Sequence, residues 1–293
     1  MNMRPNKRPV ALAAFAAALA LTLSACSDDS ADSGGDEPSA TVISHIHGLG
    51  IDPADGKLHV ATHQGIYTPG KDGAPQLVGD RKDDFMGFTV TKAGTFVASG
   101  HPAPGDDAPG NLGLIESTDA GKTWKDTSLS GDVDFHALDY ADGTLYGYDS
   151  MSGLLRASKD GVNWEKRGTL QALDIAVAPK DTDTVLATTE QGVARSTDGG
   201  KTFRHGKAPV MAFVSWPAPD TLYGIDPSGA LSLSRDEGRS WKKVSTVPGG
   251  QPQALTAVDA KHVVAATQSG VHESKDGGET FTRRLAVVSG GDH

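Results

Sequence analysis

Histidines gather in the first half of the chain, in short segments that also carry acidic residues and a methionine. His45 and His47 are two positions apart, and on an extended strand such residues point to the same side. Imidazole with thioether suits copper, and imidazole with carboxylate suits zinc. A copper or zinc site is therefore expected from His45, His47, His63, His101, His136 and Met86.

The acidic residues of the same segments allow a second chemistry. Two carboxylates on either side of a glycosidic bond can act as an acid/base pair in glycoside cleavage. Asp84, Asp134 and Glu190 are the candidates for such catalytic roles. Under this alternative the site would take a glycan, and the separation of the carboxylates would indicate a retaining or an inverting reaction.

A third possibility is a docking platform for a protein partner. The segment 102–110 is rich in Pro, Gly and Asp and is the one large insertion in an otherwise regular chain. Loops on a rigid scaffold are common places for binding sites. An exposed apolar patch beside this loop would favour the docking function.

The elements that must position these side chains are revealed by an internal repeat. Five copies of a motif such as Ser117-Thr-Asp119-Ala-Gly121-Lys-Thr123-Trp124 recur at intervals of 38 to 41 residues. A fixed period of this size indicates one supersecondary unit that is copied and stacked. The stretches between motifs are rich in Val, Thr, Tyr and Ala, are punctuated by Gly or Pro, and show no helical periodicity, which is typical of short strands.

Four antiparallel strands in each unit predict an all-β fold, a six-bladed β-propeller over residues 42–288. Seven blades are not expected because no sequence is left for the seventh, and an open β-solenoid is the alternative. The end segments are expected to pair and close the ring. The predicted blades are 42–80, 81–130, 131–170, 171–207, 208–247 and 248–288.

The aspartates of the motif are predicted to be structural. Each can accept hydrogen bonds from backbone N–H groups in the turn between the third and fourth strands, and the terminal Trp or Phe can anchor that turn to the sheet. A residue that recurs in every blade serves a need that every blade has. These aspartates are Asp119, Asp160, Asp198, Asp236 and Asp276.

The repeat also sorts residues between the two ends of the propeller. The first strands of blades 1 to 3 begin with His45-Ile46-His47, Asp84-Phe85-Met86 and Asp134-Phe135-His136, and the second strands of blades 1 and 2 end at His63 and His101. Because neighbouring strands are antiparallel, the start of the first strand and the end of the second share one end of the blade. We expect these residues at one mouth of the channel, opposite the motif turns.

The N-terminus predicts export and lipid anchoring. Residues 1–25 combine a basic start with an uncharged Ala/Leu-rich run, the layout of a secretory signal peptide. The segment ends in Leu-Ser-Ala before Cys26, the only Cys of the chain, which resembles a lipoprotein cleavage site; an ordinary signal peptide is the alternative. Residues 26–41 would be a lipidated Cys and disordered acidic tether, and 289–293 a C-terminal tail.

The charge composition restricts the classes of partner that are expected. The chain has 27 Lys and Arg against 37 Asp and Glu, a balance that argues against nucleic acid. The expected partners are a membrane, through Cys26, and a small ligand, glycan or protein at the histidine-rich face. We expect a monomer on the outer face of the bacterial cytoplasmic membrane.

The motifs resemble the Asp-box, or BNR, repeats of bacterial sialidases and of non-enzymatic propellers such as assembly factors of photosystem II and sortilin-type receptors. More narrowly, segments such as His45-Ile-His47-Gly-Leu-Gly resemble Asp-box lipoproteins labelled "glycosyl hydrolase-like". The resemblance implies a propeller over 42–288. A sialidase site needs three converging arginines, and the place of the first is taken by His45-Ile46-His47. Sialidase activity is therefore not expected, and whether the protein is an enzyme stays open.

Overall fold

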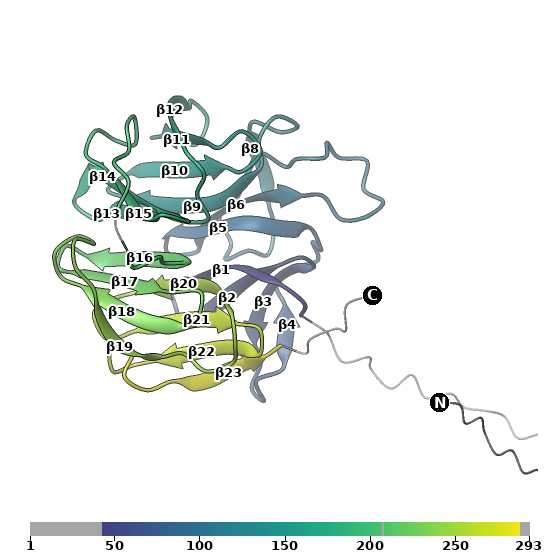
Figure 1. Cartoon of the computed structure of the whole chain (residues 1–293). Helices are drawn as coiled ribbons and strands as arrows, with labels where there is room; N and C mark the ends of the chain where they lie inside the picture. Colours follow the sequence, from purple (N-terminus) through teal and green to yellow (C-terminus); the bar gives the residue numbers. More distant parts are fainter. Residues whose placement is uncertain (1–42, 207, 288–293) are drawn as a thin grey trace, which may run out of the picture. The chain divides into compact units, whose positions relative to one another are not determined.

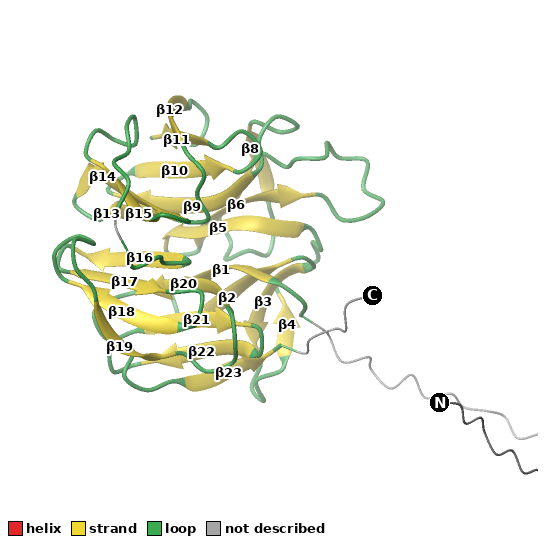
Figure 2. Ribbon diagram, viewed as in Figure 1, coloured by secondary structure: helices red, strands yellow, loops and turns green. Residues whose placement is uncertain are grey.

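The computed structural model describes residues 43–206 and 208–287, which form six small antiparallel sheets and no helix (Figures 1 and 2). The sheets are arranged as a six-bladed β-propeller, which confirms the predicted fold class. The predicted signal peptide, Cys26, the tether and the tail 289–293 lie outside the described residues. Within the described part of the chain, no helix is long and apolar enough to cross a membrane.

The blades follow one another along the sequence. Blades 1 to 3 comprise β1 (Ile46–Ile51), β2 (Leu58–Thr62), β3 (Gly65–Pro69) and β4 (Pro75–Leu77); β5 (Asp84–Lys92), β6 (Thr95–His101), β7 (Leu114–Ser117) and β8 (Lys125–Ser128); and β9 (Phe135–Ala141), β10 (Thr144–Asp149), β11 (Leu154–Ser158) and β12 (Glu165–Thr169). Blades 4 to 6 comprise β13 (Ile175–Ala178), β14 (Asp181–Thr189) and β15 (Gly192–Ser196); β16 (Phe213–Ala218), β17 (Thr221–Ile225), β18 (Ala230–Ser234) and β19 (Lys242–Thr246); and β20 (Pro252–Ala257), β21 (Val263–Thr267), β22 (Gly270–Ser274) and β23 (Thr282–Ala286).

Blade 4 departs from the predicted four strands. Its sheet contains β13, β14 and β15, and at the place of a fourth strand Arg204 pairs with Arg195 through an isolated bridge. The following segment reaches Pro209, which has no N–H to donate to a ladder. One pair of residues therefore stands in for the outer strand of this blade.

The ring is closed by packing, whereas pairing of the end segments was expected. The sheets of blades 1 and 6 contain only strands that are consecutive in sequence, as far as the chain is described. Ile46 and Leu49 of β1 belong to one buried apolar cluster with Val264 and Ala266 of β21. Burial of apolar side chains between the two sheets therefore holds the first blade to the last.

A side chain accepts a backbone hydrogen bond at every joint between blades. Because an unpaired buried N–H is costly, these bonds help to fix the spacing of the inner strands. In ring order, the acceptors and donors are Asp52 and Gly94 N (3.0 Å), Ser99 and Phe135 N (3.0 Å), Asp139 and Val177 N (2.7 Å), Asp174 and Val214 N (2.9 Å), Ser215 and Ala257 N (2.9 Å), and Gln253 and Ile46 N (3.3 Å).

The repeated motif forms a compact turn after the third strand. Oδ1 of Asp119 accepts the Thr123 N–H at 2.9 Å and Oδ2 accepts the Thr123 hydroxyl at 2.7 Å, while the Ser117 hydroxyl also donates to Asp119. The bonds from Thr123, first through its hydroxyl, lower the pKa of Asp119 to about 2. Both carboxylate oxygens are thus occupied within the turn, as the sequence predicts for a structural residue.

Candidate metal centre

The side chains at the channel mouth project from β-bulges. In blades 1, 2, 3 and 6, the register between the first and second strands shifts by one residue at the same repeat position. The extra residues are His47, Met86, His136 and Gln253, and all four line one wide opening of about 1270 Å³. A bulge re-aims the side chain of its extra residue. The sequence pattern did not reveal these bulges.

Glycines next to the bulges let neighbouring inner strands come close. A Cβ at Gly48 would lie 2.8 Å from the Cβ of Phe88, and a Cβ at Gly87 would lie 2.3 Å from the carbonyl oxygen of Phe135. A side chain does not fit at either position. Gly48 and Gly87 directly follow His47 and Met86, so a glycine after the mouth residue is the signal that could have indicated a bulge.

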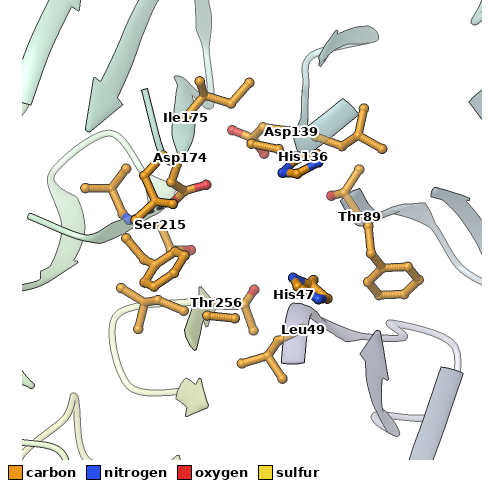
Figure 3. A pocket seen from close by; sticks show the side chains of 18 of the residues that line it. His47, Leu49, Thr89, His136, Asp139, Asp174, Ile175, Ser215 and Thr256 are labelled. Carbon is orange, nitrogen blue, oxygen red and sulfur yellow. Dashed lines mark hydrogen bonds between the residues drawn. The ribbon is translucent and has the colours of Figure 1, made fainter. Parts of the chain in front are cut away.

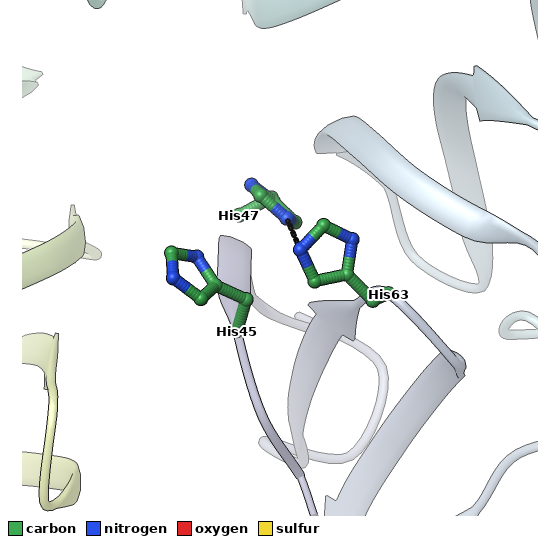
Figure 4. Close-up of side chains that lie close together, drawn as sticks. All are labelled: His45, His47 and His63. Atoms are coloured by element: carbon green, nitrogen blue, oxygen red, sulfur yellow. Dashed lines mark hydrogen bonds between the residues drawn. The ribbon is translucent and has the colours of Figure 1, made fainter. Parts of the chain in front are cut away.

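Three imidazoles converge in blade 1 (Figure 4). Nε2 of His47 lies 3.3 Å from Nε2 of His63, and the ring centroid of His45 is 5.6 Å from that of His47 and 5.3 Å from that of His63. One nitrogen from each ring lies within 4.8 Å of the others, a grouping that could hold a metal ion. His45 directly precedes β1, yet its ring shares the side of His47, as expected.

Asp84, at the start of blade 2, adds a carboxylate to this group. Its Oδ1 lies 2.8 Å from Nδ1 of His63 and 4.0 Å from Nε2 of His47. This oxygen accepts no hydrogen bond of regular geometry from the described residues. The negative charge favours a proton on Nδ1 of His63, which leaves Nε2 with a lone pair on the side of His47. Asp84 is therefore placed to hold the ring of His63 with Nε2 toward His47.

His47 is held in the neutral form that a metal requires. Burial, followed by the proximity of His63, lowers the pKa of His47 to about 4, although Asp84 opposes the shift. Only the unprotonated imidazole has a free lone pair for a metal. His47 is thus available as a ligand at neutral and mildly acidic pH.

The other two predicted histidine ligands, His101 and His136, form a second group with Asp134, one joint further around the ring. Nε2 of His136 lies 2.6 Å from Oδ2 of Asp134, and Nε2 of His101 lies 3.6 Å from the same oxygen. One atom from each residue again lies within 4.8 Å of the others. The five histidines were expected at one mouth as a single set, and the structure places them there as two groups.

The catalytic candidates take different positions. Asp84 and Asp134 lie against histidines of the two groups, and Glu190 is exposed on the opening. Met86 lines the same opening as His45, His47 and His136. The scattered histidines that were expected to be structural or solvated include His262, which contacts Glu273 at 2.7 Å.

Two further carboxylates, which the sequence reasoning missed, face the channel below the mouth (Figure 3). Asp139 and Asp174 line a cavity of about 100 Å³ together with His47 and His136. Each is partly open to the lumen but lies deep in the protein, and this burial raises the pKa of Asp139 to about 6 and that of Asp174 to about 7. Each also accepts a backbone N–H from the next blade.

Comparisons with known proteins place the fold. No protein-family model and no curated protein matches the chain. Among solved structures, an ancestral GH74 enzyme aligns with 13% sequence identity and a TM-score of 0.54; the alignment covers 84% of this chain and 38% of the enzyme. A GH74 enzyme from Niastella koreensis aligns with 18% sequence identity and a TM-score of 0.53; the alignment covers 83% of this chain and 37% of the enzyme. A chain of the nidogen/laminin complex aligns with 10% sequence identity and a TM-score of 0.60; the alignment covers 80% of this chain and 98% of that chain.

These similarities show that the fold is a β-propeller, and the chemistry has to be inferred from the residues of the site. The chain spans under two fifths of the GH74 enzymes that it matches. At such identities the fold is shared, while function depends on the residues grafted onto it.

Proposed function

We propose that this protein binds a transition metal ion, copper or zinc, through His45, His47 and His63 at the mouth of the channel. The observation that supports the proposal is the convergence of three imidazole nitrogens within 4.8 Å of one another. Three histidines leave a coordination position open. Cu²⁺ should bind more tightly than Zn²⁺, because nitrogen sites follow the Irving–Williams order.

The surroundings of the three histidines fit metal binding. The low pKa of His47 removes competition from protons at that ligand, and Asp84 favours the tautomer of His63 that presents Nε2. Carboxylate partners of metal-binding histidines commonly fix ring orientation in this way. The opening of about 1270 Å³ above the site gives a ligand or a donor protein access to the metal.

The metal site is proposed to work outside the cytoplasmic membrane, on an Asp-box lipoprotein anchored through Cys26. This part of the proposal is supported by the basic and Ala/Leu-rich N-terminus and by the single Cys that follows it. A Cys26→Ser variant should move from the membrane fraction to the soluble fraction of exporting cells. Retention of the variant on the membrane would contradict lipid anchoring at this residue.

Glycoside cleavage has less support at this site. Asp84 lies 2.8 Å from His63, and Asp134 lies 2.6 Å from His136, so each carboxylate is engaged by an imidazole. A glycosidase pair needs one group that protonates the leaving oxygen and another that serves as base or nucleophile. The docking alternative also has less support. Beside the insertion, the exposed apolar side chain is that of Met151, which Asn111 contacts.

The test of the proposed function is metal uptake by the soluble domain. After removal of bound metal, the protein should take up Cu²⁺ or Zn²⁺, and His47→Ala or His63→Ala should abolish binding at this site. His205→Ala is the matched control, because His205 lines the same opening but belongs to neither histidine group. Unchanged uptake by both site variants would refute the proposal.

A further inference from the structure

We infer that His101, Asp134 and His136 form a second metal site, separate from the three-histidine site and built from two imidazoles and one carboxylate. The ligand would be a divalent transition metal ion of the zinc class. The inference does not depend on metal binding by His45, His47 and His63. It rests on the environment of a buried carboxylate and on the tautomer of one histidine.

The carboxylate of Asp134 lacks a partner for one of its oxygens. Asp134 is 3% exposed, and its Oδ1 is buried without a hydrogen bond. A buried carboxylate without full pairing is costly to the fold. A cation bound at the other oxygen, Oδ2, which the rings of His101 and His136 approach, would compensate the charge that the carboxylate shares between its two oxygens.

The backbone contact of His101 determines how its ring faces Asp134. Nδ1 of His101 lies 2.9 Å from the carbonyl oxygen of Gly110, and a carbonyl only accepts hydrogen bonds, so Nδ1 carries the proton. The tautomer with its single proton on Nδ1 presents the lone pair of Nε2 toward Oδ2 of Asp134, 3.6 Å away. Two lone pairs that face each other at this distance are suited to a cation between them.

His136 completes the set from the bulge of β9. Its Nε2 lies 2.6 Å from Oδ2 of Asp134, and the three candidate ligand atoms all lie within 4.8 Å of one another. A metal ion at their centre would replace this direct contact with coordination by all three groups. Three protein ligands with an open fourth position are typical of zinc sites that bind a water or a substrate.

The two sites differ in charge. The first group offers three imidazoles, with Asp84 beside them, whereas the second includes a buried carboxylate among its ligands. The carboxylate neutralises one of the two positive charges of the ion, and its oxygen is a harder ligand, in the sense of hard and soft acids and bases, than an imidazole nitrogen. A mouth with both groups would hold two metal ions on adjacent joints of the ring.

Zinc stoichiometry of the soluble domain tests the inference. Demetallated protein is titrated with Zn²⁺ by calorimetry, and bound zinc is counted by elemental analysis after desalting. We expect two equivalents in the wild type, one in Asp134→Asn, one in His63→Ala and none in the double variant. His101→Ala, which changes a partly exposed side chain, should also bind one equivalent and guards against misfolding of the Asp134 variant.

The other outcomes separate the two claims. One equivalent that survives Asp134→Asn and His101→Ala but is lost in His63→Ala would refute the second site and leave the proposed function intact. One equivalent that survives only in His63→Ala would support the second site and contradict zinc binding by His45, His47 and His63, and the same titration with Cu²⁺ then decides the proposed function. One equivalent that is lost in every variant would indicate a single shared site and overturn the inference.

Discussion

Nδ1 of His63 lies 2.8 Å from Oδ1 of Asp84, although the two residues belong to neighbouring blades. His63 follows the second strand of blade 1, and Asp84 begins the first strand of blade 2. His101 and Asp134 repeat this relationship between blades 2 and 3, at 3.6 Å. The joints between blades therefore bring histidine and carboxylate together twice at the mouth.

Asp84→Asn should weaken metal binding at the three-histidine site by about 10- to 100-fold, the usual effect of removing the carboxylate partner of a metal-binding histidine. The carboxamide keeps the size of the side chain but loses the charge that favours a proton on Nδ1 of His63. Competition against a chromophoric chelator measures the affinity. Asp106→Asn, in the exposed insertion, is the control, and equal affinities of the two variants would contradict the orienting role.

Asp174→Asn should make stability less dependent on pH. The pKa of Asp174 is raised to about 7, mainly by burial, so the folded state holds its proton more firmly than the unfolded state. This contribution favours folding at acidic pH and is lost as the pH rises from about 4 to about 7. Relative to the variant, the wild type should lose about 1–2 kcal/mol between pH 5 and pH 8, after allowance for water in the channel.

Urea unfolding of both proteins at each pH measures this difference. His47 acts in the opposite direction, because its pKa is lowered to about 4 and its stabilising contribution is lost as the pH falls from 6.5 toward that value. The comparison between variant and wild type cancels the His47 contribution. The same pH dependence in both proteins would show that Asp174 does not hold a proton in the folded state.

Asp119→Ala should destabilise the fold by about 1 kcal/mol, because hydrogen bonds to a partly exposed charged acceptor have modest net value. The variant loses the bonds that Asp119 accepts from Thr123 and Ser117. Metal uptake at the mouth should be unchanged, since the turn lies at the other end of the blade. A loss of metal binding without a loss of stability would disprove the structural role.

Gly87→Ala should destabilise the protein by about 2–3 kcal/mol through overpacking. The new Cβ would lie 2.3 Å from the carbonyl oxygen of Phe135, and a backbone atom cannot move aside as a flexible side chain can. Because Phe135 lies between Asp134 and His136, zinc binding at the second group should weaken as well. Gly110→Ala, where a Cβ meets nothing within 4 Å, is the control for thermal unfolding, and His205→Ala, outside both histidine groups, is the control for zinc binding.

The repeat predicts the architecture well because each motif turn depends on neighbouring residues. Every predicted blade range contains one observed sheet, for example 81–130 around β5 to β8. The same period places the predicted histidines at one mouth. Blade 4 shows the limit, because its outer segment forms one isolated bridge where the repeat predicts a fourth strand.

The division of the histidines into two groups was not predictable from spacing. The bulges at His47 and His136 arise from the register with the next strand of the same blade, and the spacing of the repeat does not reveal that register. Asp139 and Asp174 were missed for a related reason. Their carboxylates lie at joints between blades, and an alignment of the repeats does not show which residues of neighbouring blades meet.

Four blades offer the mouth one residue each from the same bulge, and those residues are His47, Met86, His136 and Gln253. The register shift belongs to the backbone, so the side chain that it directs into the opening can be exchanged while the core of its blade is unchanged. A single codon change, such as Met86→His, would place another imidazole in the opening. The same scaffold can thus acquire new metal-coordinating side chains one substitution at a time, in evolution or by design.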